Sequence, residues 1–158
     1  MREKYMLEAL KEAKKAYLKK EVPVGAIIVK NDIIIARGHN LKEIKQCAIN
    51  HAEIIAINRA CKKLNSWRLL DCEMYVTLEP CVMCMGAIIN SRIKKLYIGT
   101  MDMKTGACGS KLDLINDYKF NHTVEVEKGI LSEECEYILK DFFKKLRKEK
   151  KLTEENND

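Results

Sequence analysis

The sequence contains few of the residues that divide a chain into separate domains. It has only two prolines in 158 residues, Pro23 and Pro80, and we find no internal repeat, low-complexity tract or linker. No apolar run approaches the roughly 18 residues of a membrane-spanning helix. The first residues lead into a charged amphipathic pattern rather than an apolar signal segment. These absences argue against a membrane protein, and we expect one cytoplasmic domain with a substantial core.

Disulfide bonds are not expected either, although the chain has seven cysteines. An odd number of cysteines in a cytoplasmic protein argues against a disulfide framework. Only Cys81 and Cys84 stand at a spacing typical of metal ligands. We interpret the other five as small buried or incidental thiols: Cys47, Cys61, Cys72, Cys108 and Cys135.

Positive charge is in excess and is concentrated near the C-terminus. The formal net charge is +6, and residues 140–151 hold seven basic and two acidic residues, a net charge of +5. A basic helix can bind nucleic acid through its charge. It can also be a solvated helix face, and charge alone favours that reading.

Hydrophobic spacing predicts a chain in which helices and strands alternate. A strand–helix–strand order in the middle implies parallel pairing, whereas the first two strands read as an antiparallel hairpin. The pattern therefore predicts an α/β fold with a mixed sheet covered by helices. The expected helices are 3–20, 51–64, 81–91 and 132–150, the expected strands are 24–29, 33–36, 73–78, 96–99 and 123–126, and residues 101–119 are mostly loop. We expect Pro80 in the first turn of the third helix and Ser132 as the N-cap of the last.

The strongest chemical signal is His51-Ala52-Glu53, followed by Pro80-Cys81-Val82-Met83-Cys84. Imidazole nitrogen and thiolate sulfur are ligands that suit zinc. Cys81 and Cys84 lie three residues apart at a helix start, so both sulfurs can face one point. With His51 as a third ligand, one position of a tetrahedral zinc stays open for water, as in catalytic rather than structural sites.

Glu53 has two possible roles. In the first turn of a helix its carboxylate can reach the open zinc position and carry a proton from water to substrate. Alternatively, Asn50 caps the helix and Glu53 completes a capping box. Each residue taken singly favours its structural role, but the joint pattern favours a catalytic zinc site.

The pattern is the one known from zinc deaminases of nucleobases. Over roughly residues 5–150, the chain resembles the bacterial tRNA-specific adenosine deaminases of the cytidine-deaminase-like superfamily. The segments that carry the resemblance are 21–26, 77–84, 90–93, 102–106, 121–122, 129–131 and 141–143, together with Arg147.

The resemblance implies a three-layer α/β/α fold with a five-stranded mixed sheet, one zinc ion per chain and a homodimer. It also implies conversion of adenosine to inosine at the wobble position of a tRNA anticodon. Asn40 would then hold the target base, and the extruded anticodon nucleotides would be contacted by Asp102, Lys104, Asn121, Phe143 and Arg147. The structural alternatives are a turn role for Asn40, a core position for Phe143 and a surface charge for Lys104.

Two positions depart from that family. The usual Asp-Pro-Thr-Ala before the His-Ala-Glu is replaced by residues 47–50, which are Cys-Ala-Ile-Asn here, and Met85 stands where a small residue is common. Neither change removes a metal ligand or the proton carrier. We expect residues 1–152 to form a single zinc deaminase domain and residues 153–158 to form an acidic disordered tail.

Two other functions remain open. A deaminase of a free base or nucleoside, such as guanine or cytosine, would share the zinc motif but would need no basic perimeter. A non-catalytic zinc-stabilised RNA-binding module would need a fourth protein ligand, with Cys47, Cys72 or Cys108 as candidates. The basic helix and Lys104 favour the tRNA-editing enzyme.

Overall fold

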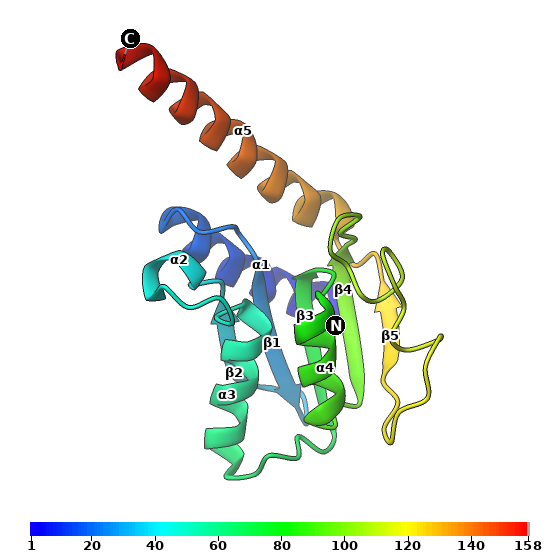
Figure 1. Cartoon of the computed structure of the whole chain (residues 1–158). Coiled ribbons are helices and arrows are strands. Elements are labelled where there is room, and N and C mark those ends of the chain that lie inside the picture. The colour runs from blue at the N-terminus through cyan, green and yellow to red at the C-terminus, as the bar shows by residue number, and fades with distance from the viewer. Residues whose placement is uncertain (158) are drawn as a thin grey trace.

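In the computed structural model, which describes residues 1–157, a five-stranded sheet in the order β2-β1-β3-β4-β5 forms the middle of the molecule (Figure 1). The first three strands in that order are antiparallel neighbours, whereas β3, β4 and β5 run parallel. The expected mixed sheet is therefore confirmed. The elements are α1 (Arg2–Leu18), β1 (Gly25–Lys30), β2 (Ile33–His39), α2 (Lys42–Lys45), α3 (Ala52–Leu64), β3 (Cys72–Leu78), α4 (Val82–Asn90), β4 (Lys95–Thr100), β5 (Glu125–Lys128) and α5 (Ser132–Asn156).

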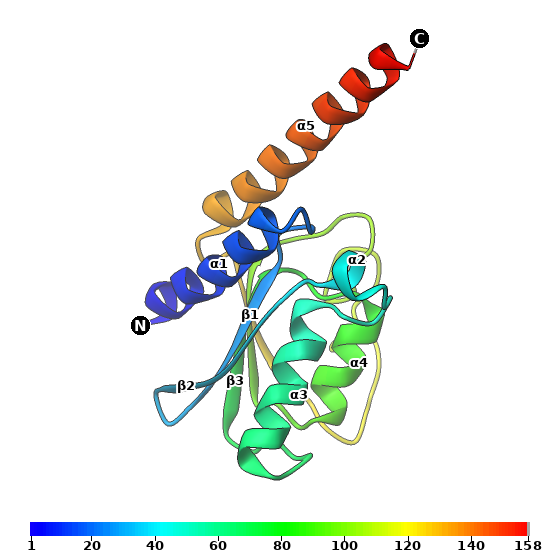
Figure 2. The same ribbon diagram turned by 90° about the vertical axis from the view of Figure 1, so that its left-hand side faces the viewer.

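Helices cover both faces of the sheet, which gives the three layers that we expected. Figure 2 shows α1 and the beginning of α5 on one side and α3 and α4 on the other. Alternating side chains explain the arrangement, because neighbouring residues of a strand point to opposite faces. In β1, Ile27 and Val29 pack in the cluster that includes α1, whereas Ile28 packs in the cluster that includes α3 and α4.

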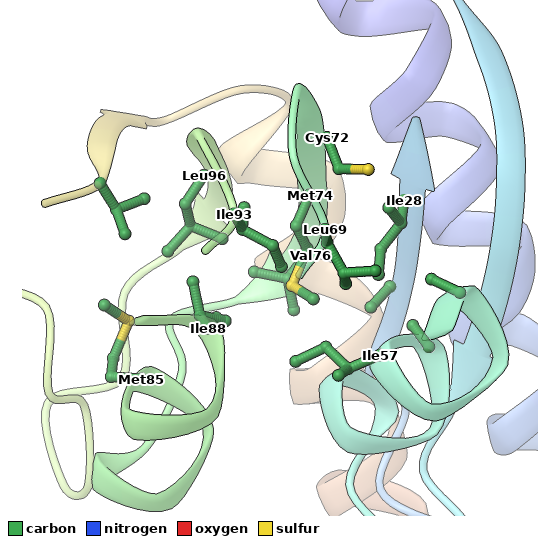
Figure 3. Packing of buried hydrophobic residues seen from close by; sticks show 14 of the residues in the cluster. Ile28, Ile57, Leu69, Cys72, Met74, Val76, Met85, Ile88, Ile93 and Leu96 are labelled. Carbon is green, nitrogen blue, oxygen red and sulfur yellow. The ribbon is translucent and has the colours of Figure 1, made fainter. Parts of the chain in front are cut away.

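The larger core lies between the sheet and the pair α3 and α4. Figure 3 shows Ile57 of α3 and Ile88 of α4 facing Met74 and Val76 of β3. Met85, which replaces a small residue of the resembled family, is fully buried in this core. The packing fixes both helices on the sheet and therefore fixes where their first residues lie.

Several element boundaries differ from our expectations. The structure caps α3 with His51 rather than Asn50, α4 with Cys81, and α5 with Leu131 rather than Ser132. Pro80 therefore precedes the helix instead of standing in its first turn. The short helix α2 was not expected, because four residues carry no hydrophobic period.

The last helix is longer than expected. It continues to Asn156, so residues 153–156 of the proposed tail are helical, and residue 158 lies outside the described residues. Beyond its first turns α5 projects from the body of the molecule (Figures 1 and 2). The boundary of the domain at residue 152 stays a prediction. Across residues 1–157, no helix combines the length and apolar character that crossing a membrane requires.

Candidate active site

Three side chains from two helix starts meet at one end of the sheet. His51 is the N-cap of α3, Cys81 is the N-cap of α4, and Cys84 lies in the first turn of α4. Their potential ligand atoms all lie within 4.8 Å of one another. The backbone NH groups and the dipole of a helix N-terminus favour negative charge there. Two such termini therefore converge where thiolates would be needed.

The geometry of the three donors fits a tetrahedral metal. His51 Nδ1 lies 3.7 Å from Cys81 Sγ and 3.6 Å from Cys84 Sγ. Zinc bonds of ordinary length at tetrahedral angles would separate a nitrogen and a sulfur ligand by about 3.6 Å. Within residues 1–157 no fourth His, Cys, Asp or Glu belongs to this group. The fourth ligand that a purely structural zinc module requires, from Cys47, Cys72 or Cys108, is therefore not present in the described part of the chain.

The charges of the donors also suit a cation. A hydrogen bond from the Cys84 thiol lowers the pKa of Cys81 to about 4, and the same bond raises the pKa of Cys84. The Cys81 sulfur in turn raises the pKa of His51 through a hydrogen bond. Cys81 is thus the sulfur that holds negative charge beside the His51 imidazole. A bound metal ion would stabilise both Cys81 and Cys84 as thiolates.

Glu53 lies one residue into α3 and is buried beside the donor group. Only 4% of its surface is exposed. Burial raises the pKa of its carboxyl to about 7, because the charged form is poorly solvated there. The capping box that we considered is not formed, since Asn50 is not the N-cap. A buried carboxyl that titrates near neutral pH can accept and return a proton, as a general acid–base requires.

A cavity of about 170 Å³ opens over these residues. Its lining includes His51, Glu53 and Cys81, and two of the expected substrate-binding residues, Asn40 and Asp102, line it as well. Val22, Val24 and Leu78 give the cavity an apolar side. A small, partly apolar hollow with a few polar groups beside a metal site is suited to a planar base.

Asn40 and Asp102 also have structural tasks. The amide nitrogen of Asn40 donates to the Val22 carbonyl, and its amide oxygen accepts from the Lys42 backbone NH. The carboxylate of Asp102 accepts from the backbone NH groups of Lys104 and Thr105 and from the Thr105 hydroxyl. The turn role that we considered for Asn40 is therefore real, and it holds the side chain at the cavity.

The remaining expected RNA contacts lie outside the cavity. Lys104 is exposed on the turn that Asp102 organises. Asn121 lies at the opposite end of the sheet, because the next residue, His122, bonds to the Ile93 carbonyl just before β4 begins. The chain does not bring Asn121 together with the other expected site residues, so any contact with the same RNA must be made some distance away.

The aromatic pair of α5 has one buried and one open member. Phe142 is buried and packs edge-to-face on Tyr17, with the ring centroids 5.9 Å apart. Phe143 is 39% exposed, which leaves part of its ring open. We expected one of the two to be buried, and the core position belongs to Phe142. Arg147 follows one turn later on the exposed part of α5.

Two buried carboxylates that support the cavity were not singled out from the sequence. Glu21 accepts hydrogen bonds from the backbone NH groups of Glu43 and Ile44, at 3.0 and 2.8 Å, in α2. Glu79 binds the backbone of the segment 102–110. Both stand in segments that carry the family resemblance, but nothing in their local pattern distinguishes them from surface acids. Their roles depend on distant loops that return to them.

The unusual residues 47–50 form a compact turn before His51. The backbone NH of Cys47 donates to the Lys42 carbonyl, and the backbone NH of Asn50 donates to the Cys47 carbonyl, each at 3.1 Å. Leu41 closes the loop with a bond to the Asn50 carbonyl, also at 3.1 Å. The entrance to α3 is therefore held by the backbone, without the proline of the resembled family.

Comparison with known proteins places the chain among deaminases. Residues 1–147 match the model of the MafB19-like deaminase family. The chain is similar to the tRNA-specific adenosine deaminase of Bacillus subtilis (strain 168), with 51% identity over 154 residues, 98% of this chain and 96% of the relative. It is 50% identical to the tRNA-specific adenosine deaminase of Haemophilus influenzae over 151 residues, 95% of this chain and 87% of the relative.

The chain is also similar to solved structures of deaminases. One, from a study of A-to-I editing by tRNA:A34 deaminases at the wobble position of transfer RNA, matches with a TM-score of 0.83 and 39% identity, over 86% of this chain and 99% of the other. A guanine deaminase from Nitrosomonas europaea matches with a TM-score of 0.75 and 26% identity, over 89% of this chain and 83% of the other.

Proposed function

The chain belongs to the MafB19-like deaminase family, and we propose that it hydrolyses adenosine to inosine at the wobble position of a tRNA anticodon. The observation that carries the proposal is the donor group of His51, Cys81 and Cys84 beside a cavity that Glu53 also lines. The tRNA substrate is supported by relatives of about half identity over nearly the whole chain, whose names give that activity.

We propose one zinc ion per chain, held by His51, Cys81 and Cys84. A zinc ion with three protein ligands supplies a Lewis acid that lowers the pKa of water toward neutrality. The chain's own contribution is to hold the three donors at tetrahedral separations and to keep them partly shielded from solvent.

Glu53 is the proposed proton carrier. Hydrolytic deamination adds water across the carbon–nitrogen bond at carbon six of adenine, forms a carbonyl there and releases ammonia. The water gives up both of its protons: one must reach the ring nitrogen next to carbon six, and the other must reach the amine that departs as ammonia. Glu53 is buried next to the donor group, and burial raises the pKa of its carboxyl to about 7, so it can both accept and donate a proton.

The remaining proposed roles concern the substrate. Asn40 lines the cavity and would bind the target base, and Asp102, which also lines it, would contact a neighbouring nucleotide. Lys104 and Arg147 would contact phosphates, and the open ring of Phe143 would stack on an unpaired base. An anticodon loop suits this arrangement because its bases are unpaired and can be turned out at a cost of a few kcal/mol or less.

We also propose a homodimer in the cytoplasm, with the anticodon arm of tRNA as the partner. The dimer would offer an explanation for Asn121, which lies at the far end of the sheet from the cavity of its own chain. A second chain can bring such a residue to an RNA that the first chain binds.

A free-base deaminase is the second candidate, because a guanine deaminase has the same fold at 26% identity. Purified protein should be incubated with a tRNA bearing a wobble adenosine, and separately with guanine, cytosine and adenosine. We expect inosine in the tRNA and little product from the free compounds. Activity on guanine or cytosine with none on tRNA would make the second candidate correct.

The zinc content tests the metal site separately. We expect about one zinc per chain by atomic absorption, and Cys84→Ala should lose most of it because one of three ligands is removed. Cys108→Ala removes a buried cysteine outside the donor group and serves as the control. Equal zinc in the Cys84 variant and the wild type would contradict the assignment.

A further inference from the structure

Glu79 is a buried carboxylate that the proposed reaction does not use. It follows β3 directly, is 3% exposed and lies in the lining of the cavity. Its oxygens accept hydrogen bonds from the backbone NH groups of Asp102, Cys108 and Ser110, at 2.9, 2.9 and 3.1 Å, and from the Ser110 hydroxyl. No Lys or Arg in the described residues forms an ion pair with it.

The segment 102–110 is wrapped around this carboxylate. A Cβ atom on Gly106 would stand 2.2 to 2.4 Å from the carboxylate atoms of Glu79, so no other residue fits there without moving them. The Ala107 NH bonds to the Pro80 carbonyl at 2.9 Å and ties the segment to the start of α4. Four donors on one buried charge form an arrangement that has little freedom to shift.

The same segment forms one wall of the cavity. Asp102 and Thr105, which follow β4, line it together with Asn40 and Lys42, which follow β2, and with His51 and Glu53 at the start of α3. We propose that Glu79 is a positioning residue, whose carboxylate holds the segment 102–110 as the wall that orients the base above Glu53. The identity of the oriented base rests on the proposed function, whereas the role of Glu79 in holding the segment 102–110 does not.

A carboxylate suits this position because three of its four hydrogen-bond partners are backbone NH groups, which can only donate. Glu79→Gln keeps the shape of the side chain but turns an NH₂ group toward one set of NH donors, and it removes the charge. Buried donors then lose their acceptor, which favours opening of the segment. Of the two proposed phosphate contacts, Arg147 on α5 lies outside this segment and is unaffected, whereas Lys104 lies within it, so a small rise in KM is expected.

Amide hydrogen exchange tests the wall without any substrate. In Glu79→Gln we expect the amides of Asp102, Cys108 and Ser110 to exchange at least 10-fold faster than in the wild type, while those of α3 and α4 keep their rates. Ser110→Ala removes only the hydroxyl bond and should give a smaller increase. Unchanged exchange in Glu79→Gln would overturn the proposal.

Kinetics on an anticodon stem-loop test the orientation of the base. A misplaced substrate can cost about 100-fold in rate, so we expect kcat of Glu79→Gln to fall about 10- to 100-fold while KM changes less than threefold. Glu12→Gln, in a carboxylate that is 2% exposed but outside the cavity, should keep kcat within threefold. A loss of kcat only in proportion to lost zinc or lost folded protein would make Glu79 merely structural and the proposal wrong.

A double-mutant cycle separates a direct link from two independent defects. Gly106→Ala must displace the Glu79 carboxylate, whereas in Glu79→Ala the space is free. Gly106→Ala should therefore lower kcat very little when it is introduced into the Glu79→Ala variant. Additive losses would contradict the coupling. If the wild type fails to deaminate tRNA but exchange responds as expected, the proposed function fails and the wall assignment stands.

Discussion

Substitution of the single residue Glu53 tests the proposed proton transfer independently of metal binding. We predict that Glu53→Ala and Glu53→Gln lower kcat at least 100-fold, because proton transfer by a positioned group contributes about 10²- to 10⁴-fold. Neither change removes a proposed ligand, so zinc per chain and the melting temperature should stay close to the wild type. Rates on a tRNA stem-loop, with zinc content measured on the same preparations, check this. A Gln variant with half the wild-type activity would rule out the proton role.

The donor group was predictable from the sequence, whereas the residues that support it were not. His51, Cys81 and Cys84 supply three ligands of two types, imidazole and thiolate, at spacings that one metal can satisfy. Glu79 was not predictable, because an isolated acid has no pattern until the segment 102–110 returns to it. The capping box that we considered at Asn50 is not formed, because α3 begins one residue later than that motif requires and its N-cap is His51.

Gly38 allows the strand β2 to pack closely against the helix α3. A Cβ atom on Gly38 would lie 2.5 Å from the Ala52 carbonyl oxygen and 2.8 Å from the Ala56 nitrogen, both backbone atoms of α3. We predict that Gly38→Ala lowers the free energy of unfolding by about 1–3 kcal/mol, as overpacking usually does. It should also lower kcat, because the first turn of α3 carries Glu53.

Gly86 provides the matched control in α4. A Cβ atom there meets nothing within 4 Å. Alanine is favoured over glycine in a helix by roughly 0.5–1 kcal/mol, so Gly86→Ala should leave stability equal or slightly higher. Urea unfolding followed by circular dichroism measures both variants. Equal stability of the two alanine variants would show that β2 and α3 can separate without cost.

The turn at Lys104 and the outer part of α5 carry the predicted electrostatic part of RNA binding. We predict that Lys104→Ala with Arg147→Ala raises KM for tRNA and leaves slow turnover of free adenosine unchanged, because the cavity is intact. The log–log dependence of affinity on salt should become less steep by about 1 to 2, since each lost contact to a single strand contributes roughly 0.7. Identical salt slopes for the variant and the wild type would exclude these contacts.

Element order was predictable from hydrophobic spacing, but element ends were not. Period-two and helical patterns found all five strands and the four long helices. The last helix was expected to end at residue 150, yet residues with good helix propensity continue it to Asn156. The four-residue α2 depends on Glu21, which accepts hydrogen bonds from two of its NH groups, so local sequence could not reveal it.

Association of two chains is the prediction that concerns the whole molecule. We expect sedimentation equilibrium at micromolar concentration to give twice the mass of the 18.2 kDa chain. Mixing chains that carry Glu53→Ala with chains that carry Asn121→Ala would test whether Asn121 acts on the partner's cavity. Mixed dimers should then hold one cavity with neither defect and recover part of the activity. A monomer at these concentrations would contradict the proposal.

The donor group and Glu53 all lie between residues 51 and 84, in the continuous unit α3–β3–α4. Much of the remaining cavity lining, and the basic helix, come from segments before and after this unit. Chemistry and recognition are therefore encoded in different stretches of the gene. Mutations in the outer stretches leave the proposed metal ligands and Glu53 in place, which offers descendants a route to new substrates wherever the wall held by Glu79 is kept. A guanine deaminase with the same fold and 26% identity is compatible with such a history. Grafting the segments 101–119 and 132–156 between relatives is the corresponding route for engineering a new preference.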